Sequence, residues 1–406
     1  MNRRFPKLAA LAALPLLLLP ACSRKAKEVA PAPVTPGAPV VLIVVDTLRS
    51  DRLPFYGYAS GATPALSALR EDSVLFESAW SHVPLTLPAH ASLFTGTLPG
   101  VHRVLDNGGY RLGPSLPTLA EILKGQGYET MGAVSSIVLA GATGISRGFD
   151  FWEDRVEPEA PGLAANRVQR PGSEAATLLG SRLDRSKSGR LFAFLHVYEP
   201  HAPYEPPEPF RSRFADPYDG EVAAADAAVG AFLDELKKAG AYDRALVVFL
   251  SDHGEGLGDH GEQQHGIFLY REAIQVPLLL KLPGQALAGA SVGAPVQLTD
   301  VFTTVGDVLA LPGFPGRAGT VSLAALARFT RLGFIRSGLE RRTVSSLVEK
   351  LRVRTTGLEQ VARDLQRLYD VRARRWLCDA HPGYTTTRWV QSRGEPYSTV
   401  LHHHAH

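Results

Sequence analysis

The chain has 406 residues, of which 45% are hydrophobic and 20% are charged, with two cysteines and a formal net charge of +3. This composition excludes a disordered, collagen-like or coiled-coil protein. Two cysteines exclude a disulfide scaffold and a four-cysteine zinc site. So small a net charge gives no indication of nucleic acid binding. The length predicts one large domain or two unequal ones.

The N-terminus has the features of an export signal. Arg3, Arg4 and Lys7 precede a short apolar run that ends in Leu19-Pro20-Ala21-Cys22. The run is too short to span a bilayer as a helix, so we expect residues 1–21 to be a signal peptide. A small residue before cysteine resembles the bacterial lipobox and predicts lipidation of Cys22. The alternative is an ordinary signal peptide with an incidental cysteine.

A Pro-rich segment follows, and residues 22–38 are therefore expected to be an extended tether between a lipid anchor and the folded body. The expected location is that of an exported, membrane-anchored bacterial lipoprotein on the periplasmic or cell-surface side. No later segment is long and apolar enough to cross a membrane.

The body of the chain predicts an α/β fold. Val40–Val45 is a continuous apolar run, as expected of a central parallel strand, and Leu191–Leu195 and Leu246–Leu250 have the same character. Helical patterns lie between them, at 118–124 and 222–238; a further strand is expected at 276–280 and a further helix at 298–309. This alternation predicts a doubly wound, mostly parallel sheet flanked by helices, with ligands beyond the carboxyl ends of the strands.

Polar residues with catalytic potential follow two of these strands. Asp46 ends the first, and Asp252-His253 follows the strand at 246–250. A carboxylate at a strand end can simply cap the next helix, which is the alternative for Asp46. Adjacent carboxylate and imidazole groups suit a divalent metal ion. Thr86, just before Pro88, is expected at a helix N-terminus, either as a cap or as a nucleophile facing an anion.

Five segments in sequence order resemble the sulfatase family of the alkaline phosphatase superfamily. They are Val45-Asp46-Thr47-Leu48-Arg49, residues 86–96, Tyr198-Glu199-Pro200-His201-Ala202-Pro203-Tyr204, Tyr218-Asp219-Gly220-Glu221-Val222, and Ser251-Asp252-His253-Gly254-Glu255 with His265-Gly266. The resemblance covers about residues 39–312. It implies an alkaline-phosphatase-like fold and a metal set of Asp46, Thr86, Asp252 and His253.

Thr86 departs from the family's sulfatases, which carry Cys or Ser that is oxidised to formylglycine. Threonine bears its hydroxyl on a secondary carbon, so oxidation would give a ketone and no aldehyde hydrate. The position instead resembles that of phosphodiesterases and of phosphoethanolamine and phosphoglycerol transferases. The resemblance implies attack of Thr86 on phosphorus, a phospho-threonine intermediate, and release by water or an acceptor alcohol.

The resemblance favours one metal ion over two. The two-metal relatives need a further carboxylate and two histidines, and Glu199, His201 and His265 are the candidates. The close spacing of Glu199 and His201 is unlike that of the two-metal enzymes. We therefore expect His201 and His265 to be general acids or substrate donors. The alternative for His265 is a loop histidine bonded to backbone. Mn²⁺ or Zn²⁺ suits the ligands better than Ca²⁺ or Mg²⁺.

Two further residues are candidates for substrate binding. Asn107 either belongs to an Asn-Gly turn or donates its amide to a phosphoryl oxygen. His90 stands where the sulfatases have arginine, and it either contacts substrate or supports the site from behind. His260 is expected to be a loop residue and no ligand.

The C-terminal region, residues 313–406, is expected to be a small subdomain whose end is atypical for the family. Residues 321–406 contain 15 Lys and Arg against 7 Asp and Glu. After Leu368-Tyr369-Asp370 the family continues with acidic residues, whereas this chain is basic. The end is therefore either truncated or out of frame, or it is a basic patch that contacts anionic lipid.

Together with the residues at the strand ends, the resemblance implies a metal-dependent hydrolase that acts on a phosphate or phosphonate ester of a small molecule, lipid or glycan. Three alternatives remain: a transferase of the phosphoethanolamine or phosphoglycerol type, a sulfuric ester hydrolase, and an inactive lipoprotein that binds an anionic glycan. Neither a formylglycine at Thr86 nor a nucleic acid partner is expected.

Overall fold

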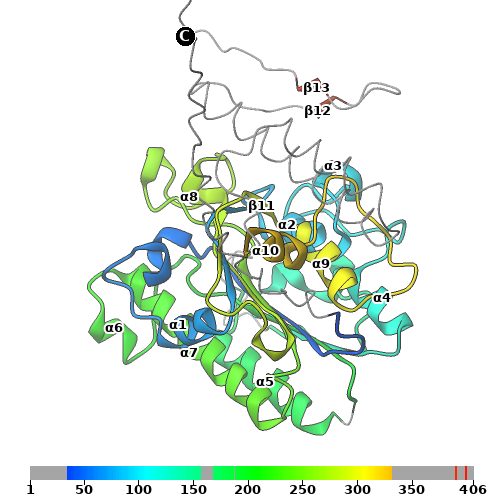
Figure 1. Cartoon of the computed structure of the whole chain (residues 1–406). Helices are drawn as coiled ribbons and strands as arrows, with labels where there is room; N and C mark the ends of the chain where they lie inside the picture. Colours follow the sequence, from blue (N-terminus) through cyan, green and yellow to red (C-terminus); the bar gives the residue numbers. More distant parts are fainter. Residues whose placement is uncertain (1–33, 157–167, 187, 332–388, 391–397, 400–406) are drawn as a thin grey trace, which may run out of the picture. The chain divides into compact units, whose positions relative to one another are not determined.

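The computed structural model describes residues 34–156, 168–186 and 188–331, together with two short strand segments at 389–390 and 398–399 (Figure 1). The expected signal peptide at 1–21, Cys22 and nearly all of the tether lie outside the described residues, as does most of the expected C-terminal subdomain. Among the described residues, no helix combines the length and the apolar character that crossing a bilayer requires.

An eight-stranded sheet forms the centre of the fold, in the order β10-β2-β9-β7-β1-β6-β4-β5. Strands β7, β1, β6, β4 and β5 run parallel, and β9 is antiparallel to both of its neighbours. The bounds are Val40–Val45 (β1), Val74–Phe76 (β2), Glu129–Ala133 (β4), Phe151–Glu153 (β5), Leu191–Val197 (β6), Leu246–Ser251 (β7), Leu278–Lys281 (β9) and Ser291–Val292 (β10). The predicted fold class is thereby confirmed.

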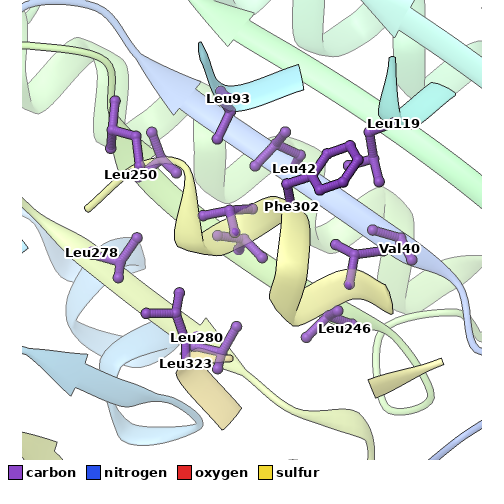
Figure 2. Packing of buried hydrophobic residues seen from close by; sticks show 14 of the residues in the cluster. Val40, Leu42, Leu93, Leu119, Leu246, Leu250, Leu278, Leu280, Phe302 and Leu323 are labelled. Carbon is purple, nitrogen blue, oxygen red and sulfur yellow. The ribbon is translucent and has the colours of Figure 1, made fainter. Parts of the chain in front are cut away.

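Strand β1 explains why the sheet is buried on both faces. Alternate side chains of a strand point to opposite faces. Val40, Leu42 and Val44 accordingly belong to one hydrophobic cluster, while the residues between them belong to a second cluster on the other face. Figure 2 shows the first cluster, where Phe302 and Leu323 pack over β1, β7 and β9. A strand with no polar position can be stable only between two such layers.

Helices cover both faces of the sheet (Figure 1). The first cluster includes residues of α2 (Thr86–Thr95), α4 (Leu119–Gly125), α9 (Asp300–Val308) and α10 (Leu323–Arg331). The second includes residues of α1 (Pro64–Glu71), α5 (Gly172–Arg185) and α7 (Pro217–Lys238). Shorter elements are α3 (Pro99–His102), α6 (Phe210–Arg213), α8 (Arg271–Ile274), a small sheet of β11 (Val296–Gln297), β3 (Ala79–Trp80) and β8 (Gln275–Val276), and the pair β12 (Trp389–Val390) and β13 (Ser398–Thr399).

Two predicted elements differ in their bounds for local reasons. The helix expected at 222–238 begins at Pro217, because Asp216 accepts a hydrogen bond from the Tyr218 N–H at the helix start. The strand expected at 276–280 is divided between β8 and β9. Pro277 lies at the break, and a proline has no N–H to donate to a strand ladder.

The strand order determines where the functional groups meet. Strand β1 lies between β6 and β7, and all three run parallel. Their carboxyl ends therefore share one edge of the sheet. Asp46 follows β1, the segment from Tyr198 to His201 follows β6, and Asp252 follows β7. The loops from three neighbouring strands thus converge at this edge, as expected for an open parallel sheet.

Candidate active site

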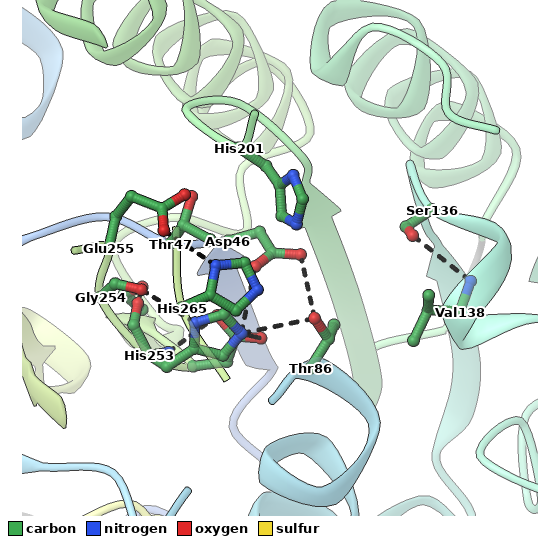
Figure 3. Close-up of polar contacts among 12 residues, drawn as sticks. Asp46, Thr47, Thr86, Ser136, Val138, His201, His253, Gly254, Glu255 and His265 are labelled. Carbon is green, nitrogen blue, oxygen red and sulfur yellow. Dashed lines mark hydrogen bonds and ion pairs between the residues drawn. The ribbon is translucent and has the colours of Figure 1, made fainter. Parts of the chain in front are cut away.

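Asp46, Asp252 and His253 form a compact buried group at the carboxyl edge of the sheet. Figure 3 shows Asp46 and His253 of this group beside Thr86. One potential ligand atom from each lies within 4.8 Å of the other two. The Nε2 atom of His253 is 3.5 Å from Asp46 Oδ1 and 3.5 Å from Asp252 Oδ2. The structure therefore brings together the two carboxylates and the imidazole that the sequence predicts as metal ligands.

The side chain of Thr86 lies beside this group. It is the first residue of α2, as expected, and its Oγ1 lies 3.5 Å from Asp46 Oδ2 and 3.4 Å from His253 Nε2. At the start of this helix, the Leu87 N–H is bonded to Asn107 and Pro88 has no N–H. The Thr86 hydroxyl thus lies at a helix N-terminus, where the helix dipole favours an anion.

The buried polar atoms of this group are themselves suited to a divalent cation. Asp46 Oδ1 and Asp252 Oδ2 are buried and have no hydrogen-bond partner. Buried carboxylate oxygens without partners are costly unless a cation neutralises them. The Nδ1 of His253 lies 3.0 Å from the Gly254 carbonyl oxygen. That contact assigns the proton to Nδ1 and leaves the Nε2 lone pair directed at the carboxylates, as metal-binding histidines require.

The two carboxylates titrate differently. Burial and the neighbouring charge of Asp46 raise the pKa of Asp252 well above its ordinary value. Burial acts in the same direction on Asp46, but the contact with His196 and the charge of His253 outweigh it and lower the pKa of Asp46. Asp252 is therefore the member of the pair that holds a proton first. A bound divalent cation favours the ionised form of both groups.

His201 and His265 lie together above this group (Figure 3). Their ring centroids are 4.9 Å apart, and the His265 ring is 4.4 Å from that of His253. His265 Nδ1 lies 2.9 Å from Glu255 Oε1, so its partner is a buried carboxylate and not backbone. Burial acts to lower the pKa of His265, but the hydrogen bond to Glu255 outweighs it and raises that pKa. Burial lowers the pKa of His201.

Asn107 contacts the helix that carries Thr86. Its Oδ1 accepts a hydrogen bond of 2.8 Å from the Leu87 N–H. An amide whose oxygen faces the helix turns its NH₂ group the other way. This contact caps the start of α2, a role that neither the turn nor the donor interpretation of Asn107 included, and it leaves the amide nitrogen available to a substrate. The role of Asn107 in substrate binding stays a prediction.

His90 lies behind the metal-ligand group. It is completely buried, its Nδ1 donates to the Thr86 carbonyl oxygen at 2.8 Å, and the same nitrogen is 3.5 Å from Asp252 Oδ2. Burial lowers the pKa of His90 to about 3, which keeps the ring neutral. It thus connects the first turn of α2 with Asp252. Substrate binding by His90 stays a prediction. His260, by contrast, is half exposed and bonded to Glu272.

Glu199 does not join the other acidic groups. Both of its carboxylate oxygens accept a 3.0 Å hydrogen bond from the Gly172 N–H, the first residue of α5. Burial raises the pKa of Glu199. The carboxylate considered for a second metal ion is therefore occupied with a helix N-terminus. In the described part of the chain, Asp46, Asp252 and His253 are the group found able to hold an ion.

The sequence-based prediction missed His196. It is the sixth residue of β6, it is completely buried, and its Nε2 lies 3.4 Å from Asp46 Oδ2 without meeting hydrogen-bond geometry. Its Nδ1 accepts from the Ser135 N–H, which places the ring proton on Nε2. A histidine near the end of an otherwise apolar strand was the available signal. Its use required knowing that β6 pairs with β1.

Further buried groups hold the strand-end loops in place. The Tyr218 hydroxyl donates to the Thr47 carbonyl oxygen at 2.7 Å and accepts from the Arg49 N–H. The Arg49 guanidinium donates to the carbonyl oxygens of Glu255 and Gly256. The loop after β1 is thereby connected both to α7 and to the loop after β7. These contacts give the Tyr218 motif a role that the sequence alone left open.

Comparison with known proteins assigns the family. The model described as Sulfatase matches residues 39–311, and the chain therefore belongs to the sulfatase family. An ulvan-active sulfatase of Formosa agariphila is 26% identical over 66% of this chain and 60% of its own length. The N-acetylgalactosamine-6-sulfatase of Homo sapiens is 26% identical over 66% of this chain and 62% of its own length. The chain thus spans about three fifths of these relatives.

Solved structures agree in fold. The phosphonate monoester hydrolase of Agrobacterium radiobacter matches with a TM-score of 0.63 and 23% identity, over 75% of this chain and 79% of that one. The phosphonate monoester hydrolase from Silicibacter pomeroyi matches with a TM-score of 0.60 and 21% identity, over 75% and 78%. These similarities support the alkaline-phosphatase-like architecture.

The end of the chain is similar to a second family. A model described as HypF Kae1-like domain matches residues 348–406. The match includes the Leu368-Tyr369-Asp370 segment and shares no residue with the sulfatase match. The boundaries predicted for the C-terminal subdomain, and its truncated or frame-shifted origin, stay predictions.

Proposed function

We propose that the chain is a metal-dependent hydrolase that cleaves phosphate or phosphonate esters through Thr86. The observation that carries this proposal is the position of the Thr86 hydroxyl, 3.5 Å from Asp46 and 3.4 Å from His253 at the N-terminus of α2. A nucleophile needs a group that lowers its pKa and a field that favours the developing anion. A cation held by Asp46, Asp252 and His253 would lower the pKa of the hydroxyl, and the helix dipole would favour the developing anion.

The identity of the nucleophile favours phosphoryl over sulfuryl transfer. A formylglycine cannot form from threonine, because the carbon that bears the hydroxyl also bears a methyl group. When an unmodified hydroxyl is the nucleophile, its oxygen stays bonded to the transferred group until water hydrolyses that ester. Displacement at phosphorus by a hydroxyl, followed by hydrolysis of the new ester, needs no such modification.

The residues of the site, together with solvent water, can supply and accept the protons that the two displacement steps require. In the first, the Thr86 hydroxyl, whose pKa a cation held by the three ligands would lower, releases its proton to solvent, and Oγ1 attacks phosphorus. The ester bond to the leaving group breaks, and His265 gives the leaving oxygen a proton. In the second step, water attacks the phospho-threonine and His265 takes a proton from that water. The Thr86 oxygen then takes up a proton from solvent, which restores the hydroxyl.

The neighbouring histidines suit these roles. His265 carries the raised pKa that a proton donor needs near neutral pH, because it is bonded to Glu255. His201 is fixed by its Nδ1, which donates to the Ala202 carbonyl oxygen, so its Nε2 remains an acceptor on the substrate side. We propose that His201 orients the leaving group or its proton.

Asp46, Asp252 and His253, together with Thr86, would hold the cation. Bound there, a divalent ion lowers the pKa of a hydroxyl and neutralises charge on phosphoryl oxygens. Mixed carboxylate, hydroxyl and imidazole donors favour Mn²⁺ or Zn²⁺ over Ca²⁺ or Mg²⁺. The engagement of Glu199 with α5 supports a single ion.

The direct experiment is an assay of purified residues 28–406 with Mn²⁺, Zn²⁺, Mg²⁺ or Ca²⁺ and four aryl esters: a phosphate monoester, a phosphodiester, a phosphonate and a sulfate. We expect turnover of one or more of the three phosphorus esters, and its loss in Thr86→Ala. Thr86→Ser is the matched control, since it keeps a hydroxyl at the same position. Turnover of the sulfate alone would refute the proposal. Acceleration by an acceptor alcohol would instead support a transferase, and metal binding without any turnover an inactive lipoprotein.

We also propose that the protein is an exported lipoprotein anchored to a membrane through Cys22, which lies outside the described residues. The support is the basic and apolar N-terminal sequence that ends in Leu19-Pro20-Ala21-Cys22. Labelling with a palmitate analogue in a bacterial host tests this. Cys22→Ser should abolish the label and release the protein from the membrane fraction, and a membrane-free wild-type protein would refute the anchor.

A further inference from the structure

One surface segment among the described residues presents an unbroken run of large apolar side chains to water. The exposed fractions are 78% for Ile267, 43% for Phe268, 57% for Leu269 and 44% for Tyr270. The other exposed large hydrophobic residues of the described chain are not adjacent in sequence. Single exposed apolar residues are ordinary, but runs of four are costly for solubility and usually have a function.

The run is fixed by the surrounding chain. The carboxylate of Glu262, a buried residue, accepts hydrogen bonds from the N–H groups of Ile267, at 2.9 Å, and of Phe268. At the other end the Tyr270 ring stacks on His260, with ring centroids 3.9 Å apart. The backbone is thus bonded on the inside while the apolar side chains face outward. Such an arrangement favours a preformed contact surface.

The run is continuous with the candidate active site. It begins two residues after His265, whose ring is 4.4 Å from that of His253. Gly266 joins the two with a φ of +117°, a conformation that favours glycine, and a Cβ built there would lie 3.6 Å from Leu85. Leu85 in turn precedes Thr86. An ester bound between Thr86 and His265 would therefore extend its leaving group toward this run.

We propose that Ile267–Tyr270 is a subsite for an apolar group on the leaving alcohol of the substrate. The substrate class is then an ester whose alcohol carries an alkyl chain. The inference rests on the proposed function in so far as cleavage occurs between Thr86 and His265. A polar sugar alcohol would leave these four side chains exposed to water and gain nothing from them, whereas an alkyl chain removes its own surface and theirs from water.

A homologous series of leaving alcohols tests the subsite. Phosphate and sulfate monoesters of alcohols from ethanol to octanol are compared by kcat/KM, and methyl- to octylphosphonate are compared as ligands by calorimetry. We expect a gain of about two- to fourfold in kcat/KM or affinity per methylene group. The double variant Ile267→Ser/Leu269→Ser should flatten this dependence and leave the ethyl ester within about twofold. Val34→Ser is the matched control: Val34 is also 57% exposed, but it precedes β1, at the opposite edge of the sheet from Thr86.

The outcomes separate this inference from the proposed function. A chain-length gain that is seen only with sulfate esters, or only in the calorimetry of an inactive protein, refutes the phosphoryl assignment and supports the subsite. Turnover of phosphate esters with no dependence on chain length overturns the subsite. So does a dependence that the double variant retains. Two further outcomes also overturn the subsite, if the chain-length gain is unchanged in the double variant. Loss of binding to phosphatidylglycerol vesicles would show that the run contacts a bilayer. A fall in the unfolding temperature would show that it contacts another segment of this chain.

Discussion

Asn107 offers the sharpest separation of a structural from a functional role. Its Oδ1 accepts the Leu87 N–H at 2.8 Å, and its NH₂ group is turned away from α2. Asn107→Asp keeps an oxygen in the accepting position and removes the amide donor. Asn107→Ala removes both. The pair of variants therefore distinguishes an N-terminal cap from a contact with a phosphoryl oxygen.

The expected magnitudes differ between stability and activity. Loss of a capping acceptor costs about 1 kcal/mol, so Asn107→Ala should lower the free energy of unfolding by about that amount. Asn107→Asp should leave it nearly unchanged. Loss of a donor to a developing oxyanion costs about 10²- to 10³-fold in rate. Both variants should therefore lose activity on this scale, and the aspartate more so, because its charge repels an anionic substrate.

The assay combines urea unfolding with steady-state kinetics on the preferred phosphorus ester, at fixed metal concentration. We expect the alanine variant to be impaired in both measurements and the aspartate variant in kinetics alone. If the aspartate variant keeps wild-type kcat/KM, Asn107 acts only as a cap and its amide does not donate to the substrate. If the alanine variant is as stable as wild type, the cap contributes nothing measurable.

Three further predictions concern the metal site and the core. His196→Leu should weaken Mn²⁺ binding about 10- to 100-fold, as measured by calorimetry. His196→Gln keeps a donor near the Nε2 position and should recover most of the affinity. Equal affinities of the wild type and the leucine variant would refute the positioning of Asp46 by His196. Removal of the metal by a chelator should lower the unfolding temperature, since a ligand at 100 times its Kd stabilises the folded state by about 2.7 kcal/mol. In Asp252→Asn the chelator should have no such effect. An unfolding temperature of the wild type that the chelator does not change would argue against a resident cation. Burial raises the pKa of Asp300 to about 7. Between its ordinary pKa and about pH 7 this carboxyl keeps its proton in the folded state and loses it in the unfolded state. Its own contribution to the unfolding free energy therefore falls by a few kcal/mol from pH 4 to pH 7, and Asp300→Asn should remove that contribution in parallel urea titrations.

Much of the fold follows from the sequence because β1 is apolar at every position and the neighbouring strands β6 and β7 are each apolar at all positions but one. Val40–Val45 cannot be stable with one face in water, so a two-sided sheet was predictable from these residues alone. The location of Asp46 and Asp252 at one edge followed from the parallel arrangement. The division of the strand at Pro277 also has a local cause, since proline interrupts a ladder.

Other parts of the site depend on contacts between segments distant in sequence. His196 became meaningful only through the pairing of β6 with β1, which places it beside Asp46. The sequence offered Glu199 as a second-metal candidate, because nothing local revealed that Gly172 at the start of α5 would take both of its oxygens. The partner of His265 was equally hidden, since a glycine-rich loop brings Glu255 back to it.

The central claim is that Thr86 becomes covalently phosphorylated during turnover. Acid quenching of the metal-loaded enzyme during turnover of a phosphate monoester, followed by peptide mass spectrometry, tests it directly. We predict that the peptide containing Thr86 gains the mass of one HPO₃ group, that fragmentation assigns it to Thr86, and that the signal disappears in Thr86→Ala. Full turnover by the Thr86→Ala variant, or phosphorylation of a different residue in the active wild type, would contradict the account.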